Sequence, residues 1–240
     1  MAVDERTHSV GRDRRFYTWV AIAIPLIVLL GFARTYYLKG LFNGPALPGL
    51  LVHLHGLVMT SWVILFIVQV RLVATRRTNI HRRLGVLGGV LAGLVILIGI
   101  TTAIAAAARG SSPGPPPLQF LVVPLGDMLL FATLVGTALY YRNRMEIHKR
   151  LMLIAAVNLL APAIARIPLH FIEAGGPLAF FGLTDLCLLI CVSYDTVKNR
   201  RLHPAFIWSV LLIIVSQPLR LMIAGTPTWL HFAGWLVKWA

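Results

Sequence analysis

Long apolar runs recur along this chain of 240 residues, and they limit the folds that it can adopt. Short polar segments separate the runs, which cover residues 16–33, 50–70, 84–108, 118–141, 151–172, 177–194 and 204–224. A bilayer core of about 30 Å requires about 20 apolar residues in a helix, so each run is long enough to cross it. We therefore predict an all-α, polytopic membrane bundle of about seven transmembrane helices, with residues 1–240 forming a single integral membrane domain.

Composition and charge support this prediction. The chain is 58% hydrophobic and only 12% charged, with a mean hydropathy of +0.80, which is far from the values of a soluble domain. The net charge of +14 comes from Lys and Arg in alternate short loops, a pattern that orients membrane proteins, so we expect no nucleic-acid partner. The basic loops predict a cytoplasmic N-terminus and an external C-terminus.

The two ends of the chain differ in character. Residues 1–15 are polar and basic, and no small-residue cleavage site follows the first apolar run, which predicts a cytoplasmic segment before a retained first span. Residues 226–240 contain Trp229, Trp235 and Trp239. Tryptophan favours the membrane–water interface, so this tail is predicted to form an interfacial helix at the outer surface.

The pattern of polar residues predicts one helical hairpin used three times after the first span. Three spans run from an intramembrane polar residue to a basic loop, and the following span then begins with a histidine. The polar residues are His55, Asp127 and Asp185, and the histidines are His81, His148 and His203. This pattern predicts a bundle built from repeated hairpins.

The histidines are the first candidate site. His55 shares a helical face with Met59 and Trp62, which predicts that it points into the bundle. Glycines follow His81 at strict four-residue steps, so they lie on one face of the predicted helix: Gly85, Gly89 and Gly93. Such a face permits close approach of a helix or of a flat ligand. His148 begins the fifth span at the same cytoplasmic level. The alternative interpretation is that both histidines are interfacial and face lipid headgroups.

Charged residues within the spans form the second candidate site. Helix rise places Asp127, Asp185, Arg166 and Arg220 at similar depth in the outer half of the bilayer, where an unpaired charge is costly. They are predicted to meet, either as two structural ion pairs or as a polar pocket that opens outward. Residues that could also line such a pocket are His55, Asn158 and Gln217. Cys187 and Cys191, one turn apart, are interpreted as core residues.

The motifs His55-Gly-Leu-Val-Met-Thr-Ser-Trp, His81-Arg-Arg-Leu-Gly and His148-Lys-Arg-Leu-Met resemble those of a family of uncharacterised bacterial multi-span membrane proteins. The second to fifth spans also resemble the transmembrane ascorbate-reducible b-type cytochromes, in which histidines on alternate helices hold one haem near each membrane face. The resemblance implies that His81 and His148 ligate the iron of a cytoplasmic-side haem b. His55 matches one outer ligand, but its partner position has Asp127 instead of histidine.

Two functions follow as hypotheses. The first is a b-type cytochrome-like redox protein of the bacterial inner membrane, with haem between His81 and His148 and a quinone or an outer acceptor as partner. The second is a membrane binding or transport protein, in which the outer cluster holds a small polar ligand or relays protons. A third possibility is an accessory subunit of a larger membrane complex. No phosphate-binding glycine loop, zinc-ligand spacing or serine nucleophile motif is present in the sequence.

The alternation of basic loops makes a testable prediction about topology. Arg76 and Arg144 should lie on the cytoplasmic side, and Gly114, Glu173 and Trp239 outside. Single cysteines at positions 114 and 144, introduced into a variant without the two native cysteines, should react with an impermeant maleimide from opposite sides of the membrane. Reaction from the same side would contradict the predicted orientation.

Overall fold

The protein is almost entirely helical. The computed structural model describes residues 2–44 and 46–239, with side chains from Arg15 onward, and contains no strand in that part of the chain. The elements are α1 Ala2–Phe32, π-helix η1 Ala33–Tyr37, 3₁₀-helix η2 Lys39–Phe42, α2 Leu50–Ala74, α3 Thr78–Ala108, α4 Pro117–Phe120, α5 Val122–Tyr140, α6 Met145–Asn158, α7 Ala161–Ile164, α8 His170–Asn199, α9 Pro204–Ile223, α10 Pro227–Leu236 and 3₁₀-helix η3 Val237–Trp239.

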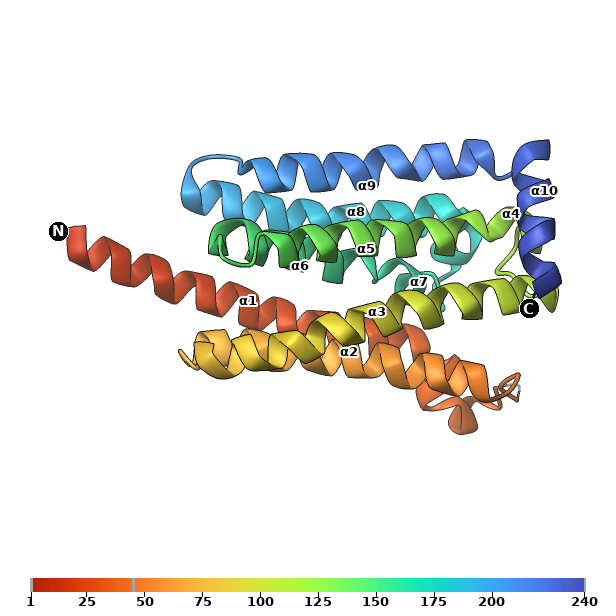
Figure 1. Cartoon of the computed structure of the whole chain (residues 1–240), viewed down its shortest axis with the longest axis horizontal. Coiled ribbons are helices and arrows are strands. Elements are labelled where there is room, and N and C mark those ends of the chain that lie inside the picture. The colour runs from red at the N-terminus through yellow and green to blue at the C-terminus, as the bar shows by residue number, and fades with distance from the viewer. Residues whose placement is uncertain (1, 45, 240) are drawn as a thin grey trace.

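Seven of the described helical segments are long and apolar enough to cross a membrane, which confirms the predicted multi-pass architecture. Figure 1 shows them running side by side. The start of α1 and the α2–α3, α5–α6 and α8–α9 turns lie at one end, which we call the basic end. The opposite end carries α10, which runs across the bundle, and we call it the α10 end. The predicted charges at Arg12 and Arg14 lie outside the described side chains.

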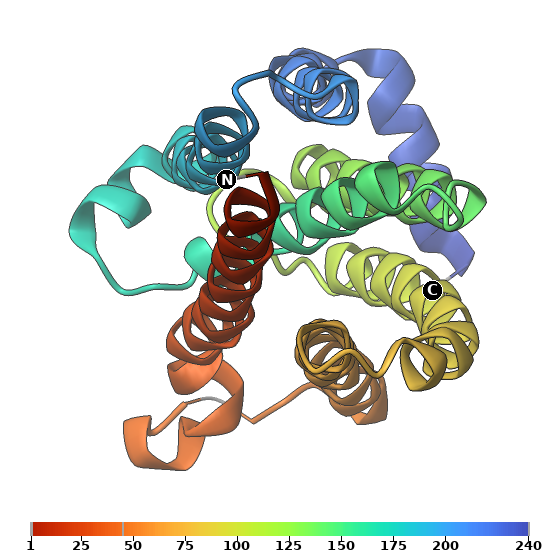
Figure 2. The same ribbon diagram turned by 90° about the vertical axis from the view of Figure 1, so that its left-hand side faces the viewer.

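Helices α5 and α6 form the centre of the bundle. In the most apolar part of Met145–Ile164, 67% of the residues are buried, against 11% in Leu50–Ala74. The interior side chains include Phe131 and Ile154, both fully enclosed. Viewed along the helices, α3, α9 and α8 lie around this centre, and α2 is more peripheral (Figure 2). Asp127 of α5 and Arg150 and Asn158 of α6 therefore have protein around them.

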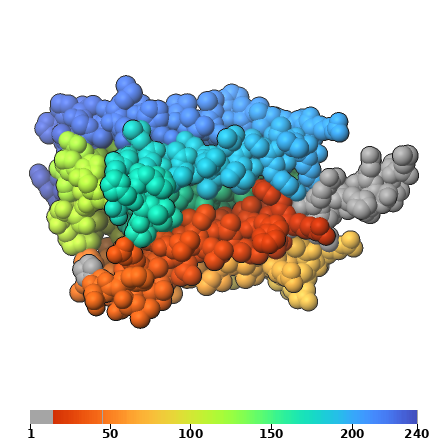
Figure 3. Space-filling view, turned by 180° about the vertical axis from the view of Figure 1, so that it is seen from behind, coloured from red at the N-terminus to blue at the C-terminus, as the bar shows by residue number. Residues whose placement is uncertain are grey.

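Helix α1 covers one face of the bundle, between α8 and the α2–α3 turn (Figure 3). At the basic end, the Phe16 ring stacks on the Tyr194 ring of α8 with centroids 3.8 Å apart. Near the α10 end, Gly31 lies directly against the backbone of Ala163, so closely that a side chain there would overlap the Ala163 carbonyl. This glycine allows α1 to touch α7 backbone to backbone.

The fifth span is broken, whereas the sequence predicted one apolar run to residue 172. Helix α6 ends at Asn158, and a tight turn then leads into the short α7. Pro162 has no N–H to donate to the Asn158 carbonyl, and a proline disfavours helical geometry in the residue before it. The chain then leaves the bundle axis and returns through α8, which is kinked at Gly176 with φ +50°.

The glycine face below His81, which the sequence suggested could admit a helix or a flat ligand, has no helix backbone in close contact with it. A Cβ on Gly85 would meet only the Gln69 amide, at 3.8 Å, and one on Gly89 only the Leu139 side chain, at 3.7 Å. Gly93 has nothing within 4 Å. The spacing of glycines does not fix which way the face is turned, and closer approaches lie at other glycines, among them Gly31, Gly99 and Gly126.

The contact between Gly31 and Ala163 can be tested by substitution. Gly31→Ala should lower the stability of the protein by about 1–3 kcal/mol, because the added methyl group has no room beside the Ala163 backbone. Gly136→Ala is the matched control, since nothing lies within 4 Å of a Cβ there and alanine favours a helix. Thermal unfolding in detergent measures both variants. Equal stability of the two would show that α1 and α7 are not in close contact.

Candidate functional site

A buried ion pair joins α5 to α9 near the α10 end. The Arg220 guanidinium donates to the Asp127 carboxylate at 2.6 Å and to the Val123 carbonyl at 3.0 Å. Both side chains are almost fully buried, with exposed fractions of 7% and 5%. One of the acid–base contacts expected between neighbouring spans is therefore present. Such a pair satisfies two charges that would be costly in the bilayer separately.

The rest of the Arg220 side chain is also fully engaged. Its Nε donates to the Ser216 carbonyl at 3.2 Å, and its second terminal nitrogen donates to the Ser216 hydroxyl at 3.3 Å. The guanidinium lies 4.9 Å from the centre of the Phe181 ring. Gly126 provides the space, because a Cβ there would overlap the Arg220 side chain. From α6, Asn158 donates to the Asp127 carbonyl at 3.3 Å.

Asp185 and Gln217 form a separate contact between α8 and α9. The Gln217 amide donates to the Asp185 carboxylate at 2.7 Å. Asp185 is only half-buried, and no Lys or Arg forms an ion pair with it among the side chains that the structure describes. The two predicted aspartates therefore have different surroundings, since one is neutralised by arginine and the other is held by an amide.

Arg166 forms no ion pair with Asp127 or Asp185, so of the two structural ion pairs that were one alternative, the described side chains show that of Asp127 with Arg220. It follows α7, donates to the Pro162 carbonyl at 2.8 Å and lies 4.9 Å from the centre of the Phe32 ring. By accessible surface, Arg166 is an exposed residue. Within the described residues, no carboxylate pairs with it.

His55 points into the bundle, as its helical face predicted. On the same face, Trp62 is buried and packs edge-on against Phe131, with centroids 5.1 Å apart. The His55 Nδ1 is buried and has no hydrogen-bond partner among the described residues.

His81 and His148 lie next to each other at the basic end. Their ring centroids are 6.4 Å apart and the ring planes make an angle of 81°. The His148 Nδ1 bonds to the Ala138 carbonyl of α5 at 2.8 Å, and the buried His81 Nδ1 has no partner. Across the described chain, no group of three or more His, Cys, Asp or Glu side chains is arranged to hold a metal ion. A metal between these two histidines would therefore need to bring further ligands with it.

A buried charge network at the basic end was not predicted. Arg150, interpreted from the sequence as a loop charge, is only 2% exposed and donates to the Asp195 carboxylate through two nitrogens, at 2.8 and 3.0 Å. It also donates to the Glu146 carboxylate at 2.6 Å. The spacing of Glu146 and Arg150 by four residues in a helix was the available signal. This network joins α6 to α8.

Two other groups have structural roles. His203 begins α9, where its Nδ1 accepts a hydrogen bond from the Ala205 amide at 3.1 Å. Burial and then the nearby Arg150 charge lower the pKa of His203, which favours the neutral ring that this cap requires. Cys187 and Cys191 are unbridged and pack with the hydrophobic core, as expected.

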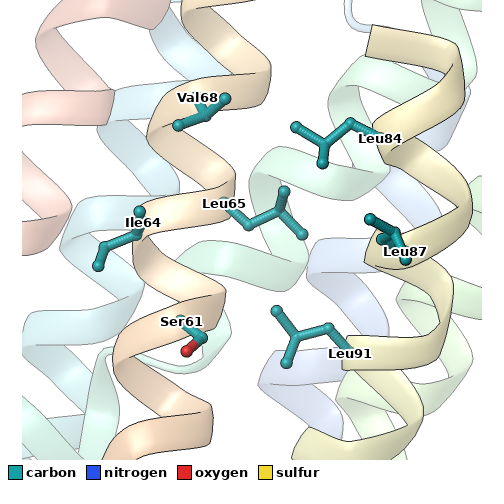
Figure 4. A pocket seen from close by; sticks show the side chains of 7 residues that line it. All are labelled: Ser61, Ile64, Leu65, Val68, Leu84, Leu87 and Leu91. Atoms are coloured by element: carbon teal, nitrogen blue, oxygen red, sulfur yellow. The ribbon is translucent and has the colours of Figure 1, made fainter. Parts of the chain in front are cut away.

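A shallow groove between α2 and α3 faces away from the bundle centre (Figure 4). Its volume is about 380 Å³. Ser61 is its single polar lining residue, and the others are Ile64, Leu65, Val68, Leu84, Leu87 and Leu91. Several of these side chains are exposed, so the groove suits lipid acyl chains and lacks the polar groups of a specific site.

Comparisons with protein-family models, with curated proteins and with solved structures give no match for this chain. They therefore lend no support to the bacterial family or to the cytochrome resemblance, which depend on the motifs alone. The interpretation of function must come from the arrangement of the side chains.

The pair of Asp127 and Arg220 predicts a specific coupling of mutations. Asp127→Asn or Arg220→Gln alone should cost about 3–5 kcal/mol, because each leaves an uncompensated buried charge. The double variant should lose clearly less than the sum of the two. The control pair is Asp127→Asn with Arg166→Gln, for which the stability losses of the single variants should add in the double variant. Reversible unfolding in mixed micelles measures the loss of stability of each variant. If the losses of Asp127→Asn and Arg220→Gln simply add in the double variant, the two side chains are not coupled as an ion pair.

Proposed function

We propose that this multi-pass membrane protein is a redox protein that binds one haem b between His81 and His148. A single observation supports the proposal: two histidines from different spans, α3 and α6, lie with their rings 6.4 Å apart at the same end of the bundle. Two imidazoles on opposite sides of an iron are the axial ligands of many b-type centres.

The distance between the rings fits this role. An imidazole nitrogen binds a metal at about 2 Å, so two imidazoles on opposite sides of one metal have ring centroids roughly 6 Å apart. The His148 Nδ1 bonds to the Ala138 carbonyl, which orients the ring and leaves Nε2 for a ligand. The unpartnered Nδ1 of His81 is consistent with a group that the protein alone does not satisfy.

The surroundings of the two histidines also suit a flat ligand. No backbone lies close to Gly85, Gly89 or Gly93, so the face below His81 is only loosely covered, with Leu139 nearest to Gly89. Arg82 and Arg83 are exposed beside His81, where they would be available to propionates. When bound, haem would exchange single electrons. The protein would orient the two imidazoles and exclude water with the neighbouring apolar side chains.

The proposal includes an orientation and a setting. The basic end would face the cytoplasm of a bacterial cell, because its turns carry most of the Lys and Arg residues. The spans after α1 would be three repeats of one hairpin, and a quinone or an external acceptor would be the redox partner. Haem near the cytoplasmic face would then take or give electrons on that side of the inner membrane.

A second candidate function is the binding or transport of a small polar ligand at the polar groups toward the α10 end. The exposed Arg166 side chain favours it, because its contacts among the described residues are the Pro162 carbonyl and the Phe32 ring, which leave its charge without a carboxylate partner. Asp127, Arg220 and Asn158 would form the rigid wall of this region, and Asp185 with Gln217 would lie on its α8–α9 side.

Absorption spectroscopy tests the haem proposal. Protein purified from cells supplied with a haem precursor should show a Soret band and sharp reduced bands, and His81→Ala or His148→Ala should abolish or shift them. His53→Ala is the control, because this exposed histidine lies on α2 outside the pair and should leave the spectrum unchanged. A wild-type protein that binds no haem, even after titration with haemin, would refute the proposal. Unchanged spectra in both variants would show that His81 and His148 are not the haem ligands.

A further inference from the structure

We propose that Gln69 is the positioning residue for His81: its side-chain amide oxygen accepts a hydrogen bond from the His81 Nδ1–H, which leaves the His81 Nε2 for iron. This inference rests on the proposed haem function, to which it adds a residue of α2. The observation that carries it is a hydrogen bond from the Gln69 amide to the His81 backbone, together with a buried, unpaired polar atom on each of these two side chains.

A hydrogen bond joins the two residues directly. The Gln69 Nε2 donates to the His81 carbonyl at 3.3 Å, which ties the last part of α2 to the start of α3. Gly85 follows His81 by one helical turn, and a Cβ there would lie 3.8 Å from the Gln69 Nε2. Residues four apart lie on one face of a helix, so the Gln69 amide packs on the face of α3 that carries His81.

The other half of the Gln69 amide has no partner. Its Oε1 is buried and accepts no hydrogen bond from the described residues, and the His81 Nδ1 is buried and equally unpaired. Buried polar atoms without partners are costly, and these two are complementary, because an amide oxygen accepts and a protonated ring nitrogen donates. Rotation about the terminal bonds of the two side chains is the movement that would pair them, since such torsions are broad in proteins.

The hydrogen bond to Nδ1 decides which ring nitrogen is left for a metal. A neutral imidazole carries one proton, and an acceptor beside one nitrogen holds the proton there. The His148 Nδ1 bonds to the Ala138 carbonyl, which can only accept, so the Nε2 of that ring is unprotonated. Gln69 gives His81 the same arrangement. Both rings then present an Nε2 lone pair, as two axial ligands of one iron require.

The residues next to His81 in the chain cannot replace Gln69. Arg82 and Arg83 carry only donors, so neither side chain can accept the Nδ1 proton. Among the described residues, no oxygen bonds to the His81 Nδ1. The amide of Gln69 is the acceptor already bonded to the same residue, and it is neutral, so it orients the ring without adding the negative charge of a carboxylate.

Nitrogen NMR of the haem-free protein tests the hydrogen bond by itself. In the full-length protein with ¹⁵N-labelled histidine, at about pH 8 where ordinary histidines are neutral, the His81 ring should carry its proton on Nδ1. The loss of a signal in His81→Ala identifies this ring. Gln69→Leu should move the proton toward Nε2, because the acceptor is gone. His148 is the internal control, since the Ala138 carbonyl holds its proton on Nδ1 in every variant.

Gln69→Glu separates the proposed role from a purely structural one. Glutamate keeps an acceptor oxygen but loses the amide donor to the His81 carbonyl. It should therefore keep the wild-type proton position on His81. If the backbone bond were the whole role of Gln69, the glutamate and leucine variants would behave alike, and that result would overturn the inference. A His81 proton in the same position in the wild type and in Gln69→Leu would also overturn it.

Titration of the same samples with haemin separates this inference from the haem function. Gln69→Leu should weaken haem binding about 10- to 100-fold, as the loss of a partner behind a metal-bound histidine does, and Gln69→Glu should bind nearly as the wild type does. Gln119→Leu is the matched control, because it makes the same change at a half-buried glutamine of α4, near the α10 end, and should bind like the wild type. A wild type with the His81 proton on Nδ1 that binds no haem would overturn the haem function and leave the hydrogen bond standing. Haem binding by Gln69→Leu equal to the wild type would overturn the positioning role.

Discussion

Two buried arginine–carboxylate pairs hold the central helices together, and each lies near a different end of the bundle. Arg220 and Asp127 join α9 to α5 toward the α10 end, and Arg150 and Asp195 join α6 to α8 at the basic end. In a bilayer no water replaces a missing partner, so each pair fixes the rotation of two helices at once. The four helices that carry these pairs enclose the most deeply buried part of the chain. α1 and α2 have no such pair among their described side chains and depend on close packing, as at Gly31.

The position of the two histidines follows from this central unit. α3 and α6 both pack on α5, and the Ala138 carbonyl of α5 binds the ring of His148. His81 and His148 each begin a helix directly after a turn at the basic end, which gives them the same depth. Equal depth on two helices that share a neighbour brings the two rings together. The recurrence of His-Lys/Arg-Arg-Leu was the pattern that pointed to the pair.

The features that could be predicted from the sequence are those that depend on hydropathy and on the free-energy cost of a buried charge. The seven spans, the inward face of His55 and a contact between an aspartate and an arginine all follow from these two quantities. The sequence did not predict which arginine binds Asp127, because helix rise gives depth and not rotation. Arg150 was misinterpreted for a related reason, since a basic residue next to a turn can point to water or back into the bundle. The glycine face below His81 has no helix backbone against it, because small residues permit a close contact without creating one.

The break after Asn158 determines what Arg166 can do. A regular helix rises 1.5 Å per residue, so an unbroken α6 would carry Arg166 about 12 Å beyond Asn158, toward the α10 end and the water there. Pro162 ends that helix, and the short α7 keeps the chain against α1, where Phe32 stacks on the guanidinium. Asn158 itself stays beside Asp127, because the break comes just after it. The break therefore separates two arginines that were expected at similar depth: Arg220 binds Asp127 in the interior, and Arg166 is exposed and lies over the Phe32 ring.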